Sequence, residues 1–118
     1  MGKPVVYFEI AGRDGEALRE FYSNLFDWQI SQHAPAGTYW YVEGEEGGVP
    51  GGIMQTTEDM PPNYVTFYVQ VDDIRKCLDQ AESLGGRTIV PPTPVPGGMG
   101  HIGIFQDPSG NSIGLHKF

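Results

Sequence analysis

The sequence predicts one α+β domain built from two β-α-β-β-β modules, at about residues 1–60 and 61–118. Its 118 residues are the length of a single domain. In each half, a segment with apolar residues at helical spacing follows a segment rich in β-branched and aromatic residues. The 17 glycines and 10 prolines cluster between these short segments, as in a domain with many turns.

The first module opens with a predicted strand at residues 4–10, PVVYFEI. A helix is predicted over 14–26, because its apolar residues recur three and four positions apart while polar residues occupy the other face. Asp14 suits the N-cap, where a carboxylate accepts a backbone N–H that has no partner within the helix. The other strands of this module are expected at 28–32, 38–43 and 52–55.

The second module repeats this order and begins with a predicted strand at 64–71. Its helix is predicted over 73–84, capped by Asp72 or Asp73. Gly85-Gly86 ends the helix, because glycine readily adopts the left-handed conformation found there. Strands are then expected at 87–90, 100–106 and 111–117, with a turn at 107–110.

The two halves can be aligned with each other, with few identical residues but a similar pattern. An offset of 61 places Val5, Tyr7 and Glu9 over Thr66, Tyr68 and Gln70. A repeat of this length indicates two similar supersecondary modules.

Composition and charge exclude several classes of protein. The 15 acidic residues outnumber the 7 basic ones, and a net charge of −8 repels phosphate backbones, so nucleic acid is not an expected partner. No run approaches the ~18 apolar residues of a membrane span, and the N-terminus lacks the layout of a signal peptide. No membrane association is therefore expected, and the cytoplasm is the expected compartment. The single cysteine, Cys77, excludes an intrachain disulfide framework, and its place on the apolar stripe of the second helix favours a structural thiol.

Five segments together resemble the glyoxalase/bleomycin-resistance/extradiol-dioxygenase group, the vicinal oxygen chelate superfamily. They read VVYFEI, LREFYSNLFDWQI, VTFYVQVDDI, AESLGG and FQDPSGNSIGL, and they span nearly the whole chain in the expected order. The resemblance implies paired modules whose curved, mixed sheet forms a cupped cavity. Because members commonly build that cavity from two chains or two modules, and because an open sheet edge needs cover, a homodimer is expected.

The resemblance also implies where a metal would bind. In metal-binding members four strand residues converge, typically His, Glu or Gln, and three of these positions fall on Val5, Thr66 and Gly114. The fourth lies within 52–55, where Ile53 or Met54 supplies no donor for a hard cation and only Gln55 does. Divalent cations need several oxygen or nitrogen ligands, so we expect no metal and no other cofactor.

Strand alternation then suggests which side chains line the cavity. Residues two apart share a face, which groups Tyr7 with Glu9, Tyr68 with Gln70, and Gly114 with His116. Such a mixture of aromatic and polar side chains suits a small-molecule pocket. The predicted ligand-binding residues are Tyr7, Glu9, Tyr41, Tyr68, Gln70, His101 and His116.

Each of these residues also has a purely structural interpretation. Glu9 is either a pocket carboxylate or a solvated or ion-paired carboxylate near the rim, and the tyrosines either contact a ligand or pack in the sheet. Trp40 and Tyr41 point to opposite faces of one strand, and the sequence does not decide which lines the cavity. His101 either reaches over the cavity mouth or lies exposed in a loop.

Two functions of different classes follow. The first is a metal-free protein that binds a small organic ligand, with Glu9 favouring a ligand that offers a hydrogen-bond donor or positive charge. The alternative is a lyase, isomerase or dioxygenase with a metal relocated to Glu9, Gln70 and His116, or an acid–base catalyst that uses Glu9 and a tyrosine. No catalytic residue is identified from the sequence.

Overall fold

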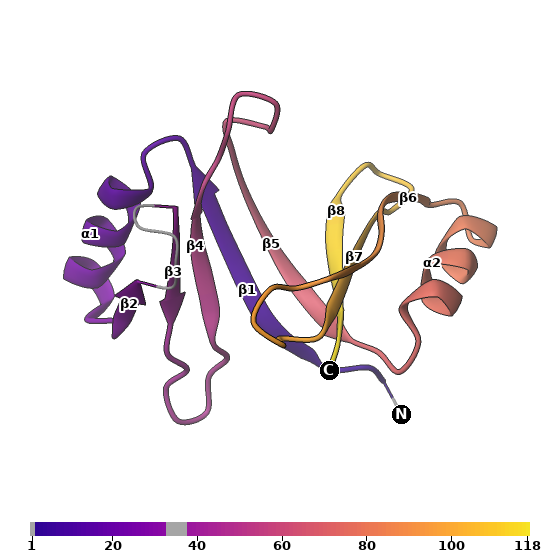
Figure 1. Ribbon diagram of the computed structural model, residues 1–118, viewed down its shortest axis with the longest axis horizontal. Helices are drawn as coiled ribbons and strands as arrows, with labels where there is room; N and C mark the ends of the chain where they lie inside the picture. Colours follow the sequence, from indigo (N-terminus) through magenta and orange to yellow (C-terminus); the bar gives the residue numbers. More distant parts are fainter. Residues whose placement is uncertain (1, 33–37) are drawn as a thin grey trace. The chain divides into compact units, whose positions relative to one another are not determined.

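The computed structural model describes residues 2–32 and 38–118, which form two compact units (Figure 1). One unit comprises residues 7–66, and the other comprises residues 1–6 with 67–118, so that the division falls inside two strands. The predicted α+β class is confirmed. The elements are β1 (Val5–Gly12), α1 (Gly15–Phe26), β2 (Ile30–Gln32), β3 (Tyr39–Val42), β4 (Gly51–Gln55), β5 (Asn63–Gln70), α2 (Ile74–Ser83), β6 (Arg87–Pro94), β7 (His101–Gln106) and β8 (Ser112–Lys117).

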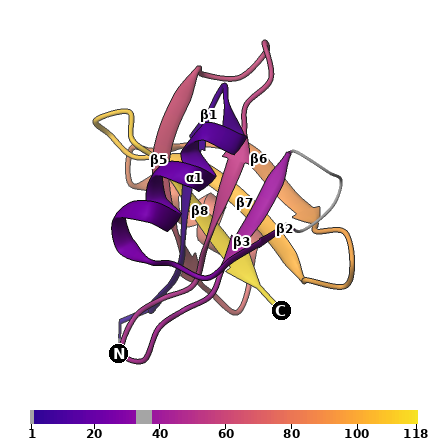
Figure 2. The ribbon, with the colours of Figure 1, turned by 90° about the vertical axis from the view of Figure 1, so that its left-hand side faces the viewer.

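In the 7–66 unit the strands lie in the order β2-β3-β4-β1. The β1/β4 pair is parallel and the other pairs are antiparallel. Helix α1 covers one face of these strands (Figure 2). Trp40, Val42 and Ile53 are buried on that face, and the side chains packed around them are Phe8, Leu18, Tyr22, Trp28 and Ile30. Trp28 therefore packs against the core.

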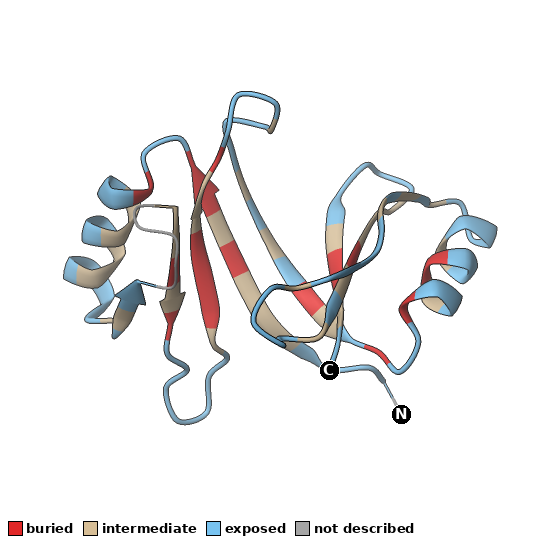
Figure 3. Ribbon diagram, viewed as in Figure 1, coloured by how far each residue is buried: buried red, intermediate tan, exposed pale blue. Residues whose placement is uncertain are grey.

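In the other unit the strands lie in the order β5-β8-β7-β6. The β5/β8 pair is parallel, and β8/β7 and β7/β6 are antiparallel. Helix α2 packs on one face, where Val71, Ile74, Leu78 and Leu115 form the buried core. In Figure 3 most buried positions of each unit lie on its strands. Helix α2 adds Ile74 and Leu78, whereas in α1 only Gly15 is buried, and the outer face of both helices is exposed. Both units thus share one topology, which is the basis of the repeat in the sequence.

Both helices begin at the predicted caps. The Asp14 Oδ1 atom accepts from the Ala17 amide at 3.0 Å, and Asp73 Oδ1 accepts from the Lys76 amide at 3.0 Å, so Asp73 rather than Asp72 is the cap. Helix α2 is followed by Gly85 at φ +102°, the left-handed conformation that glycine adopts at little cost. Neither of the helices within residues 2–32 and 38–118 has the length and apolarity to cross a membrane.

Three strand boundaries differ from the prediction by two or more residues. Strand β1 extends to Gly12 instead of ending at residue 10. Strand β6 extends to Pro94 instead of ending at residue 90, although Pro91, Pro92 and Pro94 lack an amide proton. The strand tolerates them because it lies at the end of its unit's strand order and its pairing with β7 shifts register twice. Strand β2 begins at Ile30 instead of residue 28, because the Trp28 ring packs on Phe8 and Tyr22, with centroids 5.4 and 5.5 Å away. Residues 33–37, between the second and third predicted strands, lie outside the described residues.

Candidate functional site

The face of the 7–66 unit opposite α1 carries most of its tyrosines. On β1, Phe8 packs into the core beneath α1, so Tyr7 and Glu9 point to the other face. On β3, Trp40 and Val42 occupy the core, and the adjacent Tyr39 and Tyr41 consequently project from the opposite face. The structure thus resolves the Trp40/Tyr41 alternative, with Trp40 beneath the helix and Tyr41 on the same face as Glu9.

Glu9 is the centre of this face. Its side chain is 6% exposed, and its Oε1 accepts a hydrogen bond from the Tyr64 hydroxyl at 2.9 Å. A longer bond of 3.4 Å joins the Tyr39 hydroxyl to Oε2. Burying a carboxylate is costly unless hydrogen bonds replace its hydration, and the two phenols supply them. Burial excludes the interpretation of Glu9 as a solvated carboxylate at the rim.

A third phenol extends the hydrogen-bonded group. The Tyr7 and Tyr39 hydroxyls lie 2.6 Å apart, and either can be the donor. Both reach over Gly52, which pairs with Glu9 on one side and with Tyr41 on the other. A Cβ atom at Gly52 would overlap the Tyr39 hydroxyl and crowd that of Tyr7. The absent side chain at this position therefore makes room for the two hydroxyls.

The electrostatics of the group keep its phenols neutral. Burial raises the pKa of Tyr7 to about 12. The hydrogen bond with Tyr39 lowers this pKa, whereas the charge of Glu9 raises it further. The pKa of Tyr64 is raised well above its ordinary value, first by burial and then by the charge and hydrogen bond of Glu9. At neutral pH both residues thus act as hydroxyl donors and acceptors rather than as phenolates.

The 67–118 unit holds three other predicted residues, also on one face. Tyr68 pairs with Gly114 and Gln70 with His116, so Tyr68, Gln70 and His116 share the face opposite α2. The ring of Tyr68, which is 7% exposed, covers Gly114, and Gln70 is exposed. The His116 Nε2 donates to the Met99 carbonyl at 2.8 Å, so backbone rather than a predicted site residue engages this nitrogen.

His101 lies apart from those three residues. On β7, Gly103 and Phe105 face α2, and Gly103 lies against Ile74. His101 lies two residues before Gly103, so it is on the same face of the strand. It lines a hollow beside Asp72 and Asp73 at the start of α2. The structure therefore does not bring His101 together with Tyr68, Gln70 and His116, because alternation along β7 turns it to the opposite face.

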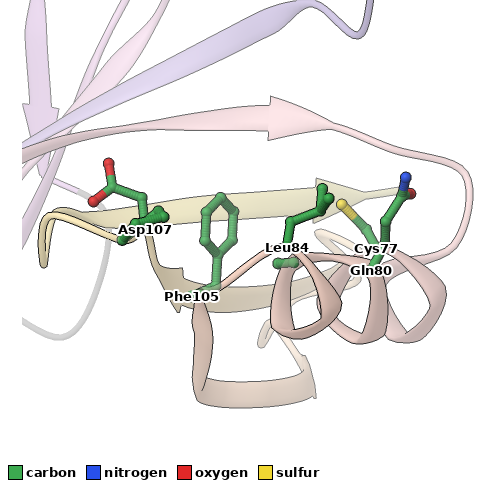
Figure 4. Close-up of a pocket in the computed structure, with 8 residues that line it drawn as sticks. Cys77, Gln80, Leu84, Phe105 and Asp107 are labelled. Carbon is green, nitrogen blue, oxygen red and sulfur yellow. The ribbon is translucent and has the colours of Figure 1, made fainter.

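Cys77 lines a different hollow, of about 330 Å³, between α2 and the turn that follows β7 (Figure 4). Its walls are mainly apolar and include Ala81, Leu84 and Phe105. The Asp107 carboxylate at its edge accepts from the Ser109 and Asn111 amides, which hold the turn. Burial raises the pKa of the Cys77 thiol, which keeps it protonated at neutral pH and agrees with a structural thiol.

Comparison with known proteins assigns the family. The model of the Glyoxalase/Bleomycin resistance protein/Dioxygenase superfamily matches residues 5–115. The chain belongs to this superfamily.

Three known proteins illustrate what the chain is similar to. It is 27% identical over 111 residues to a glyoxylase-like domain-containing protein of Didymella fabae, covering 88% of this chain and 85% of that protein. It is 25% identical over 126 residues to the anthracycline biosynthesis protein DnrV of Streptomyces peucetius, covering 94% of this chain but only 46% of DnrV. The methylmalonyl-CoA epimerase of Mycobacterium tuberculosis has the same fold, with a TM-score of 0.70, 13% identity, and coverage of 96% and 86%.

The positions that correspond to metal ligands in this superfamily do not fit a metal here. Val5 and Gly114 have no donor atom, and the ring of Tyr68 fills the space in which a longer side chain at Gly114 would lie. On β4, Gln55 faces α1 and its Oε1 accepts from the Gly15 amide at 3.1 Å. Within residues 2–32 and 38–118, no three or more His, Cys, Asp or Glu side chains are grouped to hold a metal ion.

Sequence reasoning missed three residues of this arrangement, namely Tyr39 and Tyr64, which bond to Glu9, and Gly52, over which two hydroxyls lie. The signal for two of them was alternation, since Tyr39 lies two residues before Tyr41, and Tyr64 two before Thr66. Gly52 carries no such signal, because its role is the space that it leaves. From here on, Glu9 with Tyr7, Tyr39 and Tyr64 is called the Glu9 group.

The raised tyrosine pKa values predict an unusual alkaline titration. Because the folded state favours the neutral phenols, the contribution of Tyr7 and Tyr64 to the free energy of unfolding should be fully present below about pH 10 and be lost as pH rises through their folded-state pKa values. Absorbance at 295 nm should show Tyr7 and Tyr64 ionising at higher pH than an ordinary tyrosine. Tyr7→Phe and Tyr64→Phe should each remove part of this late phase, and unfolded protein in guanidinium should lack it. Titration of all six tyrosines near pH 10 in the folded protein would contradict the described burial.

The space at Gly52 gives a second prediction. Gly52→Ala should separate the Tyr7 and Tyr39 hydroxyls and lower the free energy of unfolding by about 1–3 kcal/mol, the usual cost of forcing a methyl group into a filled site. Gly2→Ala is the matched control, because nothing lies within 4 Å of the added Cβ atom. Urea unfolding of both variants measures the difference. Equal midpoints would show that the hydroxyls are not packed over Gly52.

Proposed function

We propose that this protein binds a small organic ligand at the Glu9 group, without a metal, and that the ligand offers a hydrogen-bond donor or a positive charge. The observation that carries the proposal is a carboxylate, 6% exposed, that is hydrogen-bonded by tyrosine hydroxyls. Carboxylates are seldom buried without a role in pairing or binding. Buried polar groups that converge among aromatic rings are a common feature of small-molecule sites.

The chemistry of the group supports this ligand class. The Tyr64 hydroxyl donates to Glu9, and because Tyr7 and Tyr64 stay neutral at neutral pH, Glu9 is the member of the group that can carry a negative charge. A buried negative charge favours a cation or a strong donor more than it would in water, because the local dielectric is low. Tyrosine rings add flat apolar area against which an aromatic ligand can stack.

One relative suggests which compounds to test first. The printed name of DnrV refers to anthracycline biosynthesis, although this chain spans less than half of that protein. Anthracyclines are flat polycyclic compounds, and those with an amino sugar also carry a positive charge. They combine the stacking surface and the cation that the Glu9 group is suited to bind, so we propose a flat aromatic amine as the ligand class.

The test compares two forms of one compound. An anthracycline with an amino sugar should quench tyrosine or tryptophan fluorescence on binding, and its uncharged aglycone should bind more weakly. Glu9→Gln should weaken binding of the amine at least tenfold, about 1.4 kcal/mol, and change binding of the aglycone much less. Glu43→Gln, which removes an exposed carboxylate, is the matched control. Equal affinities of the Glu9→Gln and parent proteins, or binding only with an added divalent metal, would refute the proposal.

We further propose that the chain acts as a homodimer. Large apolar side chains exposed on α1 support this, namely Phe21 (58% exposed), Leu25 (57%) and Phe26 (53%). Apolar side chains grouped on a water-facing surface commonly mark a contact with another protein. Sedimentation velocity at micromolar concentration should give twice the 13.0 kDa mass of one chain, and Phe26→Ser should shift the equilibrium toward the monomer. A single 13.0 kDa species for the parent protein would contradict the dimer.

A further inference from the structure

The connection between β4 and β5 is tied to the end of β1 by the backbone. The Thr56 amide, just after β4, donates to the Gly12 carbonyl at 2.8 Å. Thr56 is 6% exposed, and its hydroxyl donates to the Pro62 carbonyl at 3.3 Å, which brings the two ends of the connection together. Residues 56–62 therefore form a closed strap beside the last residues of β1.

Arg13, the residue after β1, holds the middle of this strap. Its Nη1 donates to the Thr57 carbonyl and lies 3.4 Å from the Thr56 hydroxyl, and its Nη2 donates to the Met60 carbonyl at 3.4 Å. The Met60 amide also donates to the Thr57 carbonyl at 3.1 Å. One planar guanidinium thus joins two carbonyls across a turn, which a lysine ammonium on a flexible stem does far less specifically.

The strap leads directly to the Glu9 group. Pro62 ends it two residues before Tyr64, whose hydroxyl donates to Glu9. Pro61 and Pro62 restrict the backbone dihedrals at the end of the strap, and only Asn63 separates Pro62 from Tyr64, so a shift of the strap should reach Tyr64. Glu9 itself lies on β1, four residues before Arg13. Strand β1 and its next residue therefore hold the β4–β5 connection and the start of β5 at three points, through Gly12, Arg13 and Glu9.

We infer that Arg13 is a positioning residue, whose contacts with the strap hold the Tyr64 hydroxyl on the Glu9 carboxylate. Only its consequence for ligand binding rests on the proposed function. Without Arg13 the strap loses the contacts with two carbonyls at its centre, the start of β5 moves, and Tyr64 gains solvent and loses its bond to Glu9. The acceptor arrangement of the Glu9 group then depends on an exposed arginine that is not itself part of it.

The experiment reads Tyr64 directly. In protein labelled with ¹³Cζ-tyrosine, each of the six tyrosines gives its own NMR signal, and Tyr64→Phe and Tyr22→Phe assign two of them. Arg13→Gln should lower the pKa of Tyr64 by about half a unit or more, because exposure to water and loss of the Glu9 bond both favour the phenolate. The Tyr22 signal, from α1, should titrate as in the parent protein. Arg75→Gln is the matched control, since it removes another exposed arginine, 3.3 Å from Asp79, and should leave Tyr64 unchanged.

The outcomes separate this inference from the proposed function. An unchanged Tyr64 titration in Arg13→Gln overturns the positioning role, whatever the protein binds. If Arg13→Gln does not fold, Arg13→Lys serves instead. It keeps the charge but not the two-carbonyl geometry, so it should lower the pKa of Tyr64 in the same direction, and a parent-like titration would overturn the inference. A shifted Tyr64 signal in a protein that binds no aromatic amine supports the positioning role and refutes only the proposed function.

Discussion

The burial of one carboxylate sets the conditions that the 7–66 unit has to meet. Water no longer solvates Glu9, so hydrogen bonds from the protein must compensate for its lost hydration. Tyr64 and Tyr39 provide two of these bonds, and Tyr39 is in turn joined to Tyr7. Each partner comes from a different strand, which means that the carboxylate ties together β1, β3 and the start of β5. Truncating this side chain would therefore change the placement of several strands as well as the chemistry of the face.

In each unit a tyrosine of the first strand approaches a glycine of the last strand, by its hydroxyl in the 7–66 unit and by its ring in the other unit. Tyr7 reaches over Gly52, and Tyr68 covers Gly114. The glycine is necessary in both places, because a Cβ atom would overlap an aromatic side chain. In the second unit this arrangement fills the position at which metal-binding members of the superfamily carry a ligand. An aromatic ring over a glycine is thus an alternative use of the same strand positions, one that replaces a metal donor by a packed phenol.

Local patterns predicted the fold well, and the site less completely. Helical spacing and the carboxylates of Asp14 and Asp73 place both helices within two residues, because these signals act within one turn of chain. Strand alternation identified Tyr7 and Glu9 as neighbours on one face. Alternation shows only which residues of a strand share a face. The partners of Glu9 on β3 and β5 also depend on how the strands pair, which the sequence of a single strand does not encode. The prolines of β6 led to a predicted end of this strand that is too early, because whether a strand tolerates proline depends on its place in the sheet.

The same prolines limit how this protein can associate with others. A strand at the end of a sheet normally presents a row of amides and carbonyls to which a strand from another molecule can bind. Pro91, Pro92 and Pro94 remove three donors from the second half of β6, so a foreign strand would find carbonyls there without matching amides. Fibril-like stacking along this border is therefore disfavoured. Any stable association of two copies has to rely on side-chain packing, which depends on shape and composition and so discriminates between partners better than a bare backbone does.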